Sequence, residues 1–343
     1  MATERHPLPA AMEPPCGGWR GALAPLAQAV QRDDLRRLGR DHTTALARRL
    51  NRRNAPLIEL RRRLLAERGA ELLAHDGPAI ELHDGWAIDT SGTLPGLEAL
   101  VHRGQELIGR YAGRVYEDEK PFLQNLIPES AIDEHPELLD FITSPQVLAA
   151  VAPVFGYIPP LSPLLPRGVR LMESSTQFDP AADGPWRESQ LAHLDYHSSP
   201  TLYVFVALRD IAPEDGPLQF VGREASARLA GAIGYGRRGV PYRLTDEQVM
   251  EHVREDEMHR FAAPAGTVLF LESSACMHFG SRRPRSPRYQ MQYSFTSPVR
   301  NDFLELWRPS RVHPVRPTDA PLRRAVLDRT ADGLRALLRG GDA

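Results

Sequence analysis

The chain has 343 residues, of which 42% are hydrophobic and 25% charged, and its formal net charge is −2. This length fits one large domain with extensions, or two domains, and the composition is that of an ordinary soluble globular protein. A nearly neutral chain lacks the overall basic field that attracts nucleic acids, so we expect no nucleic-acid partner.

The cysteines and the N-terminus indicate the compartment. Cys16 and Cys276 are the only two cysteines, too few for a disulfide framework, which favours the reducing cytoplasm. Residues 1–20 are rich in Pro and Gly, lack the basic-then-apolar pattern of a signal peptide, and are expected to be flexible. Residues 144–166 are uncharged but contain six prolines, which would break a membrane-spanning helix. We therefore expect no membrane association.

Residues 21–115 are expected to form a helical N-terminal region. Apolar residues recur at helical spacing over 22–73 and again over 97–111, and a further helix is predicted over 136–154. The first stretch carries many arginines, which could form an anion-binding surface. In a nearly neutral chain, a solvated helix face is the simpler interpretation. These arginines are at positions 48, 49, 52, 53 and 61–63.

A short turn motif follows these first helices. His83 and Asp84 are adjacent and could belong to the metal site of a phosphohydrolase, but partner residues at helical spacing are missing. The Asp84-Gly85 pair lies between the alternating runs 79–82 and 86–89. This pattern is typical of a β-hairpin turn, which we predict here.

From about residue 169 the apolar residues alternate as in β-strands. Short strands joined by long insertions predict a double-stranded β-helix, a jelly-roll or cupin-like core, within residues 116–310. The fold class is therefore α+β, with N-terminal helices and a C-terminal tail, 311–343, that contains one helix over 322–338. The insertion 223–258 has helical content and is expected to cover the mouth of the core. The predicted strands lie in segments 169–178, 191–197, 201–208, 217–221, 259–271 and 288–295.

A candidate metal site begins at His193-Leu194-Asp195. Residues two apart in a strand point to the same side, so His193 and Asp195 would direct an imidazole nitrogen and a carboxylate at one point. A third ligand is expected from a distant strand, and the apolar run 265–271 leads to His278. Two histidines and one carboxylate on one face of a metal, with open positions opposite, are the ligands of non-haem Fe(II) oxygenases.

A fixed cation is expected beside this site. Arg288 follows His278 by ten residues and opens an alternating strand, which favours an inward guanidinium. Such a group suits a dicarboxylate co-substrate, and Arg285 is the alternative. Tyr203 and Phe205 alternate on one strand face and are expected to form the floor of the co-substrate pocket.

Two further residues leave alternatives open. His197 lies two residues beyond Asp195 and could face either the substrate or the solvent. Cys276 lies two residues before His278 and could approach the metal, although a small buried thiol is the simpler interpretation.

Three blocks, in this order, resemble the phytanoyl-CoA dioxygenase family of Fe(II)/2-oxoglutarate-dependent oxygenases: HLD (193–195), ALRDIAPEDGPLQFV (207–221) and GTVLFLESSACMHFGSRRPRSPRYQMQYSF (266–295). The resemblance covers roughly residues 120–298. It implies that His193, Asp195 and His278 bind Fe(II), and that Arg288 pairs with the far carboxylate of 2-oxoglutarate. It also implies that Lys120 lies where some members have a pocket lysine.

The resemblance further implies a dioxygenase that uses O2, releases succinate and CO2, and oxidises a C–H bond of a small-molecule substrate. Related halogenases have a small residue at the position of Asp195, so the carboxylate here indicates a hydroxylase-type enzyme. We expect a monomer or a homodimer.

Two other functions stay open at this point. A non-catalytic jelly-roll protein could hold a metal for structure or for ligand binding, although it would not need open coordination positions. A cupin-type isomerase, or a dioxygenase without a co-substrate, would usually use more histidines and no fixed arginine.

Overall fold

The computed structural model describes residues 40–74, 77, 79–113, 120–163, 168–174, 185–282, 284–302, 313, 315–316 and 318–340. The expected flexible segment 1–20 and the first part of the predicted N-terminal helices, residues 22–39, lie outside these residues.

Two antiparallel sheets form the centre of the molecule. The larger sheet has six strands in the order β1-β7-β4-β9-β3-β2, and the smaller has three in the order β6-β5-β8. The strands of the larger sheet are β1 (Trp86–Asp89), β2 (Leu123–Asn125), β3 (Val169–Ser174), β4 (Thr201–Ala207), β7 (Val268–Leu271) and β9 (Arg288–Thr296). Those of the smaller sheet are β5 (Gln219–Val221), β6 (Met258–Arg260) and β8 (His278–Phe279).

The larger sheet is buried on both faces. Along β4, Val204 and Val206 face the large apolar cluster that the helices share, whereas Phe205 and Ala207 face the other side and share a cluster with Phe220 of the smaller sheet. Burial on both faces explains why the sequence of β4 is almost continuously apolar. Two antiparallel sheets packed through one apolar cluster are consistent with the expected jelly-roll core.

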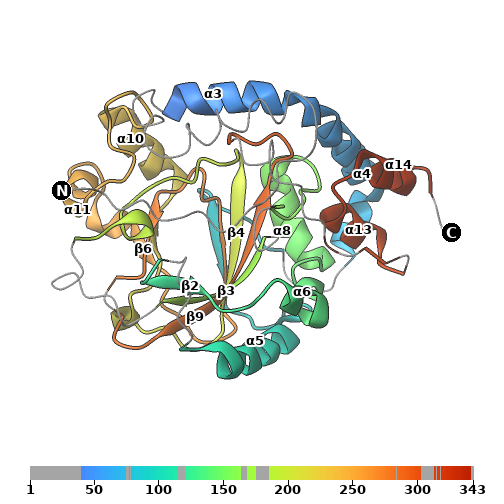
Figure 1. Ribbon diagram of the computed structural model, residues 1–343, viewed down its shortest axis with the longest axis horizontal. Helices are drawn as coiled ribbons and strands as arrows, with labels where there is room; N and C mark the ends of the chain where they lie inside the picture. The colour runs from blue at the N-terminus through green and yellow to red at the C-terminus, as the bar shows by residue number, and fades with distance from the viewer. Residues whose placement is uncertain are drawn as a thin grey trace, which may run out of the picture.

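Helices surround the sheets, with α3 along the upper edge of Figure 1, α10 and α11 at the left, and α4, α13 and α14 at the right. The main helices are α3 (Arg40–Asn51), α4 (Ala55–Leu73), α5 (Leu97–Tyr111), α8 (Pro145–Phe155), α10 (Arg223–Ile233), α13 (Pro321–Leu327) and α14 (Ala331–Leu338). The shorter ones are α6 (Ser130–Glu134), α7 (Glu137–Asp140) and α11 (Asp246–Met250), with 3-10 turns at Arg52–Asn54, Glu188–Gln190, Pro213–Asp215 and Glu255–Glu257. The helix α5 has the bounds that the sequence predicts.

Arg61 of α4 differs from the solvated arginine that the sequence suggests. Its side chain is fully buried. The guanidinium donates hydrogen bonds to the backbone carbonyls of Ile158, Ala325 and Asp328. The buried cation therefore joins α4 to the C-terminal helices.

Two predicted helices are each broken by local chemistry. The helix expected over 136–154 is divided into α7 and α8, because Pro145 at the start of α8 requires an extended Ser144 (φ −64°, ψ 145°). The prediction of a single helix over 322–338 is wrong. Thr330 caps α14 by accepting a hydrogen bond from the Gly333 N–H (3.0 Å), so α13 and α14 are separate helices.

Two predicted strands are also absent from the described residues. Residues 191–197 form only isolated bridges. Residues 79–82 are not a strand, and β1 pairs instead with β7. The predicted turn is present, because His83 and Trp86 exchange two backbone hydrogen bonds around Asp84 and Gly85, which both have positive φ. Only one arm of the expected hairpin therefore joins the sheet.

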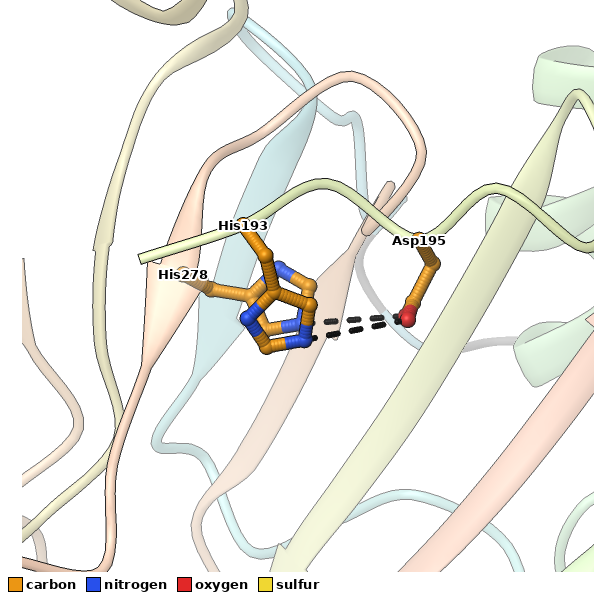
Figure 2. Close-up of side chains that lie close together, drawn as sticks. All are labelled: His193, Asp195 and His278. Atoms are coloured by element: carbon orange, nitrogen blue, oxygen red, sulfur yellow. Dashed lines mark ion pairs between the residues drawn. The ribbon is translucent and has the colours of Figure 1, made fainter. Parts of the chain in front are cut away.

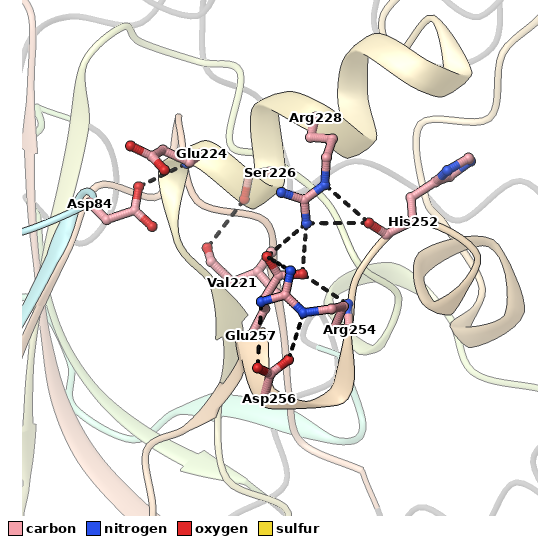
Figure 3. A network of polar contacts seen from close by, with 9 residues as sticks. All are labelled: Asp84, Val221, Glu224, Ser226, Arg228, His252, Arg254, Asp256 and Glu257. Atoms are coloured by element: carbon pink, nitrogen blue, oxygen red, sulfur yellow. Dashed lines mark hydrogen bonds and ion pairs between the residues drawn. The ribbon is translucent and has the colours of Figure 1, made fainter.

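The insertion 223–258 has the expected helical content, and a polar network holds it (Figure 3). Asp84 lies at the start of α10 and accepts hydrogen bonds from the N–H groups of Arg223 and Glu224 (both 2.8 Å). Arg228 pairs with both carboxylate oxygens of Glu257 (2.6 and 2.8 Å). The two ends of the insertion are thus fastened to each other and to the turn before β1.

Among the helices of the described residues, none combines the length and apolar character needed to span a membrane. The uncharged segment that contains α8 is instead part of the core, where Val147, Leu148 and Val151 are fully buried.

Candidate metal centre

His193 and His278 are brought together by a backbone pairing. The His193 N–H donates to the His278 carbonyl (3.2 Å), and the His278 N–H donates to the His193 carbonyl (3.0 Å). His278 belongs to β8, which pairs with β5 through Phe220. Since residues that exchange both bonds lie directly opposite each other, their side chains share one side. The two imidazole rings accordingly lie with their centroids 4.4 Å apart.

Asp195 turns its carboxylate back toward both rings (Figure 2). Its own N–H donates to the Ser273 carbonyl (2.9 Å), which fixes the backbone two residues after His193. The Asp195 carboxylate oxygens lie 3.9 Å from Nε2 of His193 and 3.7 Å from Nε2 of His278. One donor atom from each of the three residues lies within 4.8 Å of the others. The expected juxtaposition therefore exists, although an irregular segment produces it instead of the predicted strand.

The hydrogen bonds of the two rings define which nitrogen is free. Nδ1 of His193 lies 2.9 Å from the Leu191 carbonyl, and Nδ1 of His278 lies 3.0 Å from the Cys276 carbonyl. A carbonyl only accepts, so each Nδ1 carries the proton and each Nε2 presents a lone pair. Fixing the tautomer through the second nitrogen is the usual arrangement of metal-bound histidines.

The electrostatics of the cluster also suit a cation. Burial lowers the pKa of His193 well below its ordinary value, so the ring is neutral near pH 7. Burial opposes ionisation of Asp195, but the neighbouring His278, His197 and His193 lower its pKa, so the carboxylate is charged. The neutral His193 ring and the ionised Asp195 carboxylate thus face each other, with Nε2 of His278 beside them. This donor set matches a divalent transition metal.

Arg288 lies inside the protein, and the alternative Arg285 lies on its surface. Arg288 is 4% exposed and donates to Oε1 of Gln290 (2.6 Å) and to Oγ of Ser281 (3.1 Å). Arg285 is 79% exposed at its side chain and pairs with Glu214 (3.7 Å). Burial lowers the pKa of Arg288 to about 10, which leaves the guanidinium charged at neutral pH.

No described carboxylate forms an ion pair with Arg288. Its guanidinium is a buried cation whose polar partners are the neutral side chains of Gln290 and Ser281, and Ser281 lies three residues after His278. The Asp215 carboxylate is near enough to favour the charged guanidinium, but no described carboxylate binds it directly, so the position suits an anionic ligand.

Tyr203 and Phe205 lie on one face of β4 with their ring centroids 5.5 Å apart. Phe205 packs in the apolar cluster between the sheets. Tyr203 lines a cavity of about 180 Å³ together with His197. Burial, and next the nearby Asp195 carboxylate, raise the pKa of Tyr203. The Tyr203 hydroxyl is therefore close to the metal cluster and neutral.

The structure also places the three remaining candidates. His197 lines the same cavity and does not simply face solvent. Cys276 is fully buried, and its thiol lies 3.7 Å from the Asp84 carbonyl, which fits a packing role. The Lys120 ammonium lies 4.0 Å from the Glu188 carboxylate, and burial lowers its pKa. Asp195 is among the charges near enough to Lys120 to influence it.

A groove of about 770 Å³ opens beside the cluster and includes Asp195 in its lining. Its other walls come from α3, the start of α4, and the insertion. Sequence reasoning raised the arginines of this lining only as a possible anion-binding surface, and it missed the other lining residues, since no motif joins them. It also missed Ser281 and Gln290, although alternation along β9 directs Gln290 to the same side as Arg288.

Neither a protein-family model nor a curated protein matches the sequence. Among solved structures, the chain is similar to HygX from Streptomyces hygroscopicus with nickel and 2-oxoglutarate bound, with 17% identity and a TM-score of 0.39, over 62% of this chain and 82% of that one. It is similar to the epimerase SnoN in complex with Fe3+, alpha ketoglutarate and nogalamycin RO, with 12% identity and a TM-score of 0.38, over 62% and 79%. It is also similar to EctD from S. alaskensis in its apo form, with 13% identity and a TM-score of 0.34, over 62% and 73%. Because these overlays are loose, the functional assignment depends on the side chains of this chain.

Proposed function

We propose that the protein is an Fe(II)/2-oxoglutarate-dependent dioxygenase, related to the phytanoyl-CoA dioxygenase family, that oxidises a C–H bond of a small organic substrate. One observation carries the proposal. Nε2 of each histidine and the Asp195 carboxylate converge within 4.8 Å, and the segment that follows His278 leads to a buried cation that forms no ion pair with a described carboxylate.

His193, Asp195 and His278 would hold the iron. When bound, iron and 2-oxoglutarate supply dioxygen activation, with oxidative decarboxylation of the co-substrate to succinate and CO2 and oxidation of a substrate C–H bond. Three protein ligands on one side leave positions for small molecules on the other. The Leu191 and Cys276 carbonyls keep each Nε2 free of a proton, so the rings are ready to bind metal.

Arg288 would bind the far carboxylate of the co-substrate. A guanidinium can give a carboxylate two parallel hydrogen bonds, and burial of Arg288 excludes the water that would compete for them. Gln290 and Ser281 hold the planar group in place. Tyr203 and Phe205 would line the co-substrate pocket from β4 and exclude water there.

The groove beside Asp195 would bind the primary substrate. The proposed metal ligands and co-substrate residues all lie within the proposed oxygenase domain, 116–310. The helical region 21–115 and the tail 311–343 would support it, and α3 would supply one wall of the groove.

Succinate formation tests the proposal. Protein loaded with Fe(II) under anaerobic conditions should bind 2-oxoglutarate, and exposure to O2 should release succinate slowly even without substrate. A library of metabolites can then be screened for compounds that accelerate succinate release. Metal binding with no succinate from either experiment would favour the alternative of a non-catalytic metal-binding jelly-roll protein.

A further inference from the structure

The groove beside Asp195 is unevenly charged. Arg48 and Arg49 of α3, and Arg52 directly after it, lie along one wall. Arg62 of α4 also lines the groove, but it is paired with Glu59 (3.6 Å). The acidic lining residues are Asp195, in the metal cluster, and Asp41, at the other end of α3.

The three arginines have no acidic partner among the described residues. Other arginines of the next helix are paired on its surface, such as Arg63 with Glu67 (3.8 Å) and Arg68 with Glu71 (2.9 Å). No such ion pair involves Arg48, Arg49 or Arg52 within the part of the chain that the structure describes. A guanidinium offers five donors and no acceptor. This wall of the groove therefore presents many donors to an anion.

The wall is held firmly against the core. The opposite side of α3 is buried, and the Asn51 amide donates to the carbonyls of Arg300 (3.0 Å) and Asp302 (2.8 Å). Between those two residues, the Asn301 N–H donates to the His197 carbonyl (3.0 Å), two residues after Asp195. The arginine wall and the metal cluster are thus joined through one short loop.

A second part of the groove lining is aromatic. Tyr196, Tyr235 and Tyr242 line the groove, with ring centroids 5.8 Å apart for Tyr196 and Tyr242 and 5.5 Å apart for Tyr235 and Tyr242. The hydroxyls of Tyr235 and Tyr242 donate to backbone carbonyls of Tyr242 and Leu194, respectively. The three rings therefore give the groove an aromatic lining against which the carbon part of a ligand can pack.

We infer that the substrate is an organic anion. Its phosphate or carboxylate group binds Arg48, Arg49 and Arg52, and its carbon part packs along the tyrosines so that a C–H bond lies beside the metal cluster. This inference rests on the proposed oxygenase function for the role of substrate, but the anion site itself needs no metal. The sequence favours a solvated helix face for these arginines, whereas this inference assigns them a specific ligand.

Calorimetric titration of the metal-free full-length protein tests the site. Phenyl phosphate and benzoate serve as anionic probes, and phenol serves as the uncharged probe of similar shape. We expect the better of the two anions to bind at least about tenfold more tightly than phenol, and to weaken with added salt because the arginines are exposed. The ranking of the two anions identifies the preferred group.

Variants locate the binding. The combined R48Q, R49Q and R52Q variant should lose at least about tenfold in anion affinity, and R52Q alone should lose part of it. R63Q is the matched control, since Arg63 is exposed, paired with Glu67 and outside the groove. Equal binding of phenol and both anions, or unchanged affinity in the combined variant, would overturn the inference. A loss of anion affinity in R288Q, with none in the combined variant, would also overturn the inference, because the anion would then occupy the co-substrate site.

The outcome is separable from that of the proposed function. Anion binding is measured without iron, whereas substrate-free succinate formation by the wild-type protein needs no organic anion besides 2-oxoglutarate. Anion binding at the arginine wall without succinate formation would support the anion site and refute the oxygenase function. Succinate formation without anion binding would support the oxygenase function and refute the anion site.

Discussion

His193 and His278, 85 residues apart in the chain, exchange both of their backbone hydrogen bonds (3.2 and 3.0 Å). This pairing sets the two rings side by side, and a carbonyl two residues before each histidine fixes its tautomer. Backbone hydrogen bonds therefore set the positions of both rings, and each of the three side chains can be tested separately.

Asp195→Ala should abolish metal binding at physiological iron concentrations. The substitution removes the one charged ligand, so the expected loss of affinity is at least about 100-fold, the upper end of what losing an outer-shell partner costs. Iron content after anaerobic reconstitution, together with succinate formation, measures the effect. Asp256→Ala is the control, because Asp256 is an exposed aspartate whose partner is Arg254 on the surface. Wild-type iron content in Asp195→Ala would refute the assignment of the ligands.

Arg288→Ala should selectively weaken the binding of 2-oxoglutarate. Truncating one partner of a buried hydrogen-bonded charge pair costs roughly 2–5 kcal/mol, or about 30- to 4,000-fold in affinity. The affinity of Arg288→Lys for 2-oxoglutarate should lie between those of the wild type and Arg288→Ala, since an ammonium cannot form the two parallel hydrogen bonds. Iron content should be nearly unchanged in both variants, because Arg288 is not a ligand. The 2-oxoglutarate dependence of succinate formation measures these losses.

The neighbouring arginine provides the comparison for that experiment. Arg285 is exposed and pairs with Glu214, so Arg285→Ala should keep the wild-type dependence on 2-oxoglutarate. A large loss in Arg285→Ala with none in Arg288→Ala would mean that the exposed residue is the anchor.

Local sequence patterns are sufficient to predict the position of a side chain where one segment alone determines it. Alternation over 288–295 places Arg288 inside and leaves Arg285 outside, and the β-strand β9 forms over these residues. The spacing of His193 and Asp195 also anticipated their proximity, although the predicted strand does not form. Asp195 is instead positioned by its bond to Ser273, a long-range contact that no local pattern contains.

Long-range contacts account for what the sequence did not predict. The sequence predicts a hairpin at Asp84-Gly85, but this turn also binds the start of α10, 140 residues away. Helical periodicity likewise cannot separate Arg61, buried against the C-terminal helices, from Arg48 and Arg52 in the groove. In each case the partner lies in a distant part of the chain.

Arg61→Ala should destabilise the fold without touching the metal cluster. It leaves the carbonyls of Ile158, Ala325 and Asp328 without their donor and opens a cavity, so we expect a loss of roughly 3 kcal/mol or more. Urea denaturation followed by circular dichroism measures the change. Arg63→Ala, on the exposed side of the same helix, should stay within about 0.5 kcal/mol of wild type. Equal stability of the two variants would refute a structural role for Arg61.

The loop between α10 and α11 is coupled to the metal motif through Leu194. The Leu194 N–H donates to the Tyr235 hydroxyl (3.1 Å), and the Leu194 carbonyl accepts from the Tyr242 hydroxyl. Both backbone groups of the residue between His193 and Asp195 are thus held by the insertion. Tyr242→Phe removes one of these bonds, and a typical loss of about 0.5–1.5 kcal/mol predicts roughly 2- to 13-fold weaker metal binding.

Two measurements on Tyr242→Phe follow from this coupling. Competition with a chelator should show the weaker Ni(II) affinity, and hydrogen exchange should be faster in residues 234–245 but unchanged in α10, whose start Asp84 holds. Tyr111→Phe is the control, since Tyr111 is a buried tyrosine of α5 in the large apolar cluster. In wild type, exchange over 234–245 should slow when Ni(II) and 2-oxoglutarate bind, because an ordered metal motif in turn orders the loop. Unchanged metal affinity in Tyr242→Phe would contradict the coupling and leave the insertion as a separate structural unit.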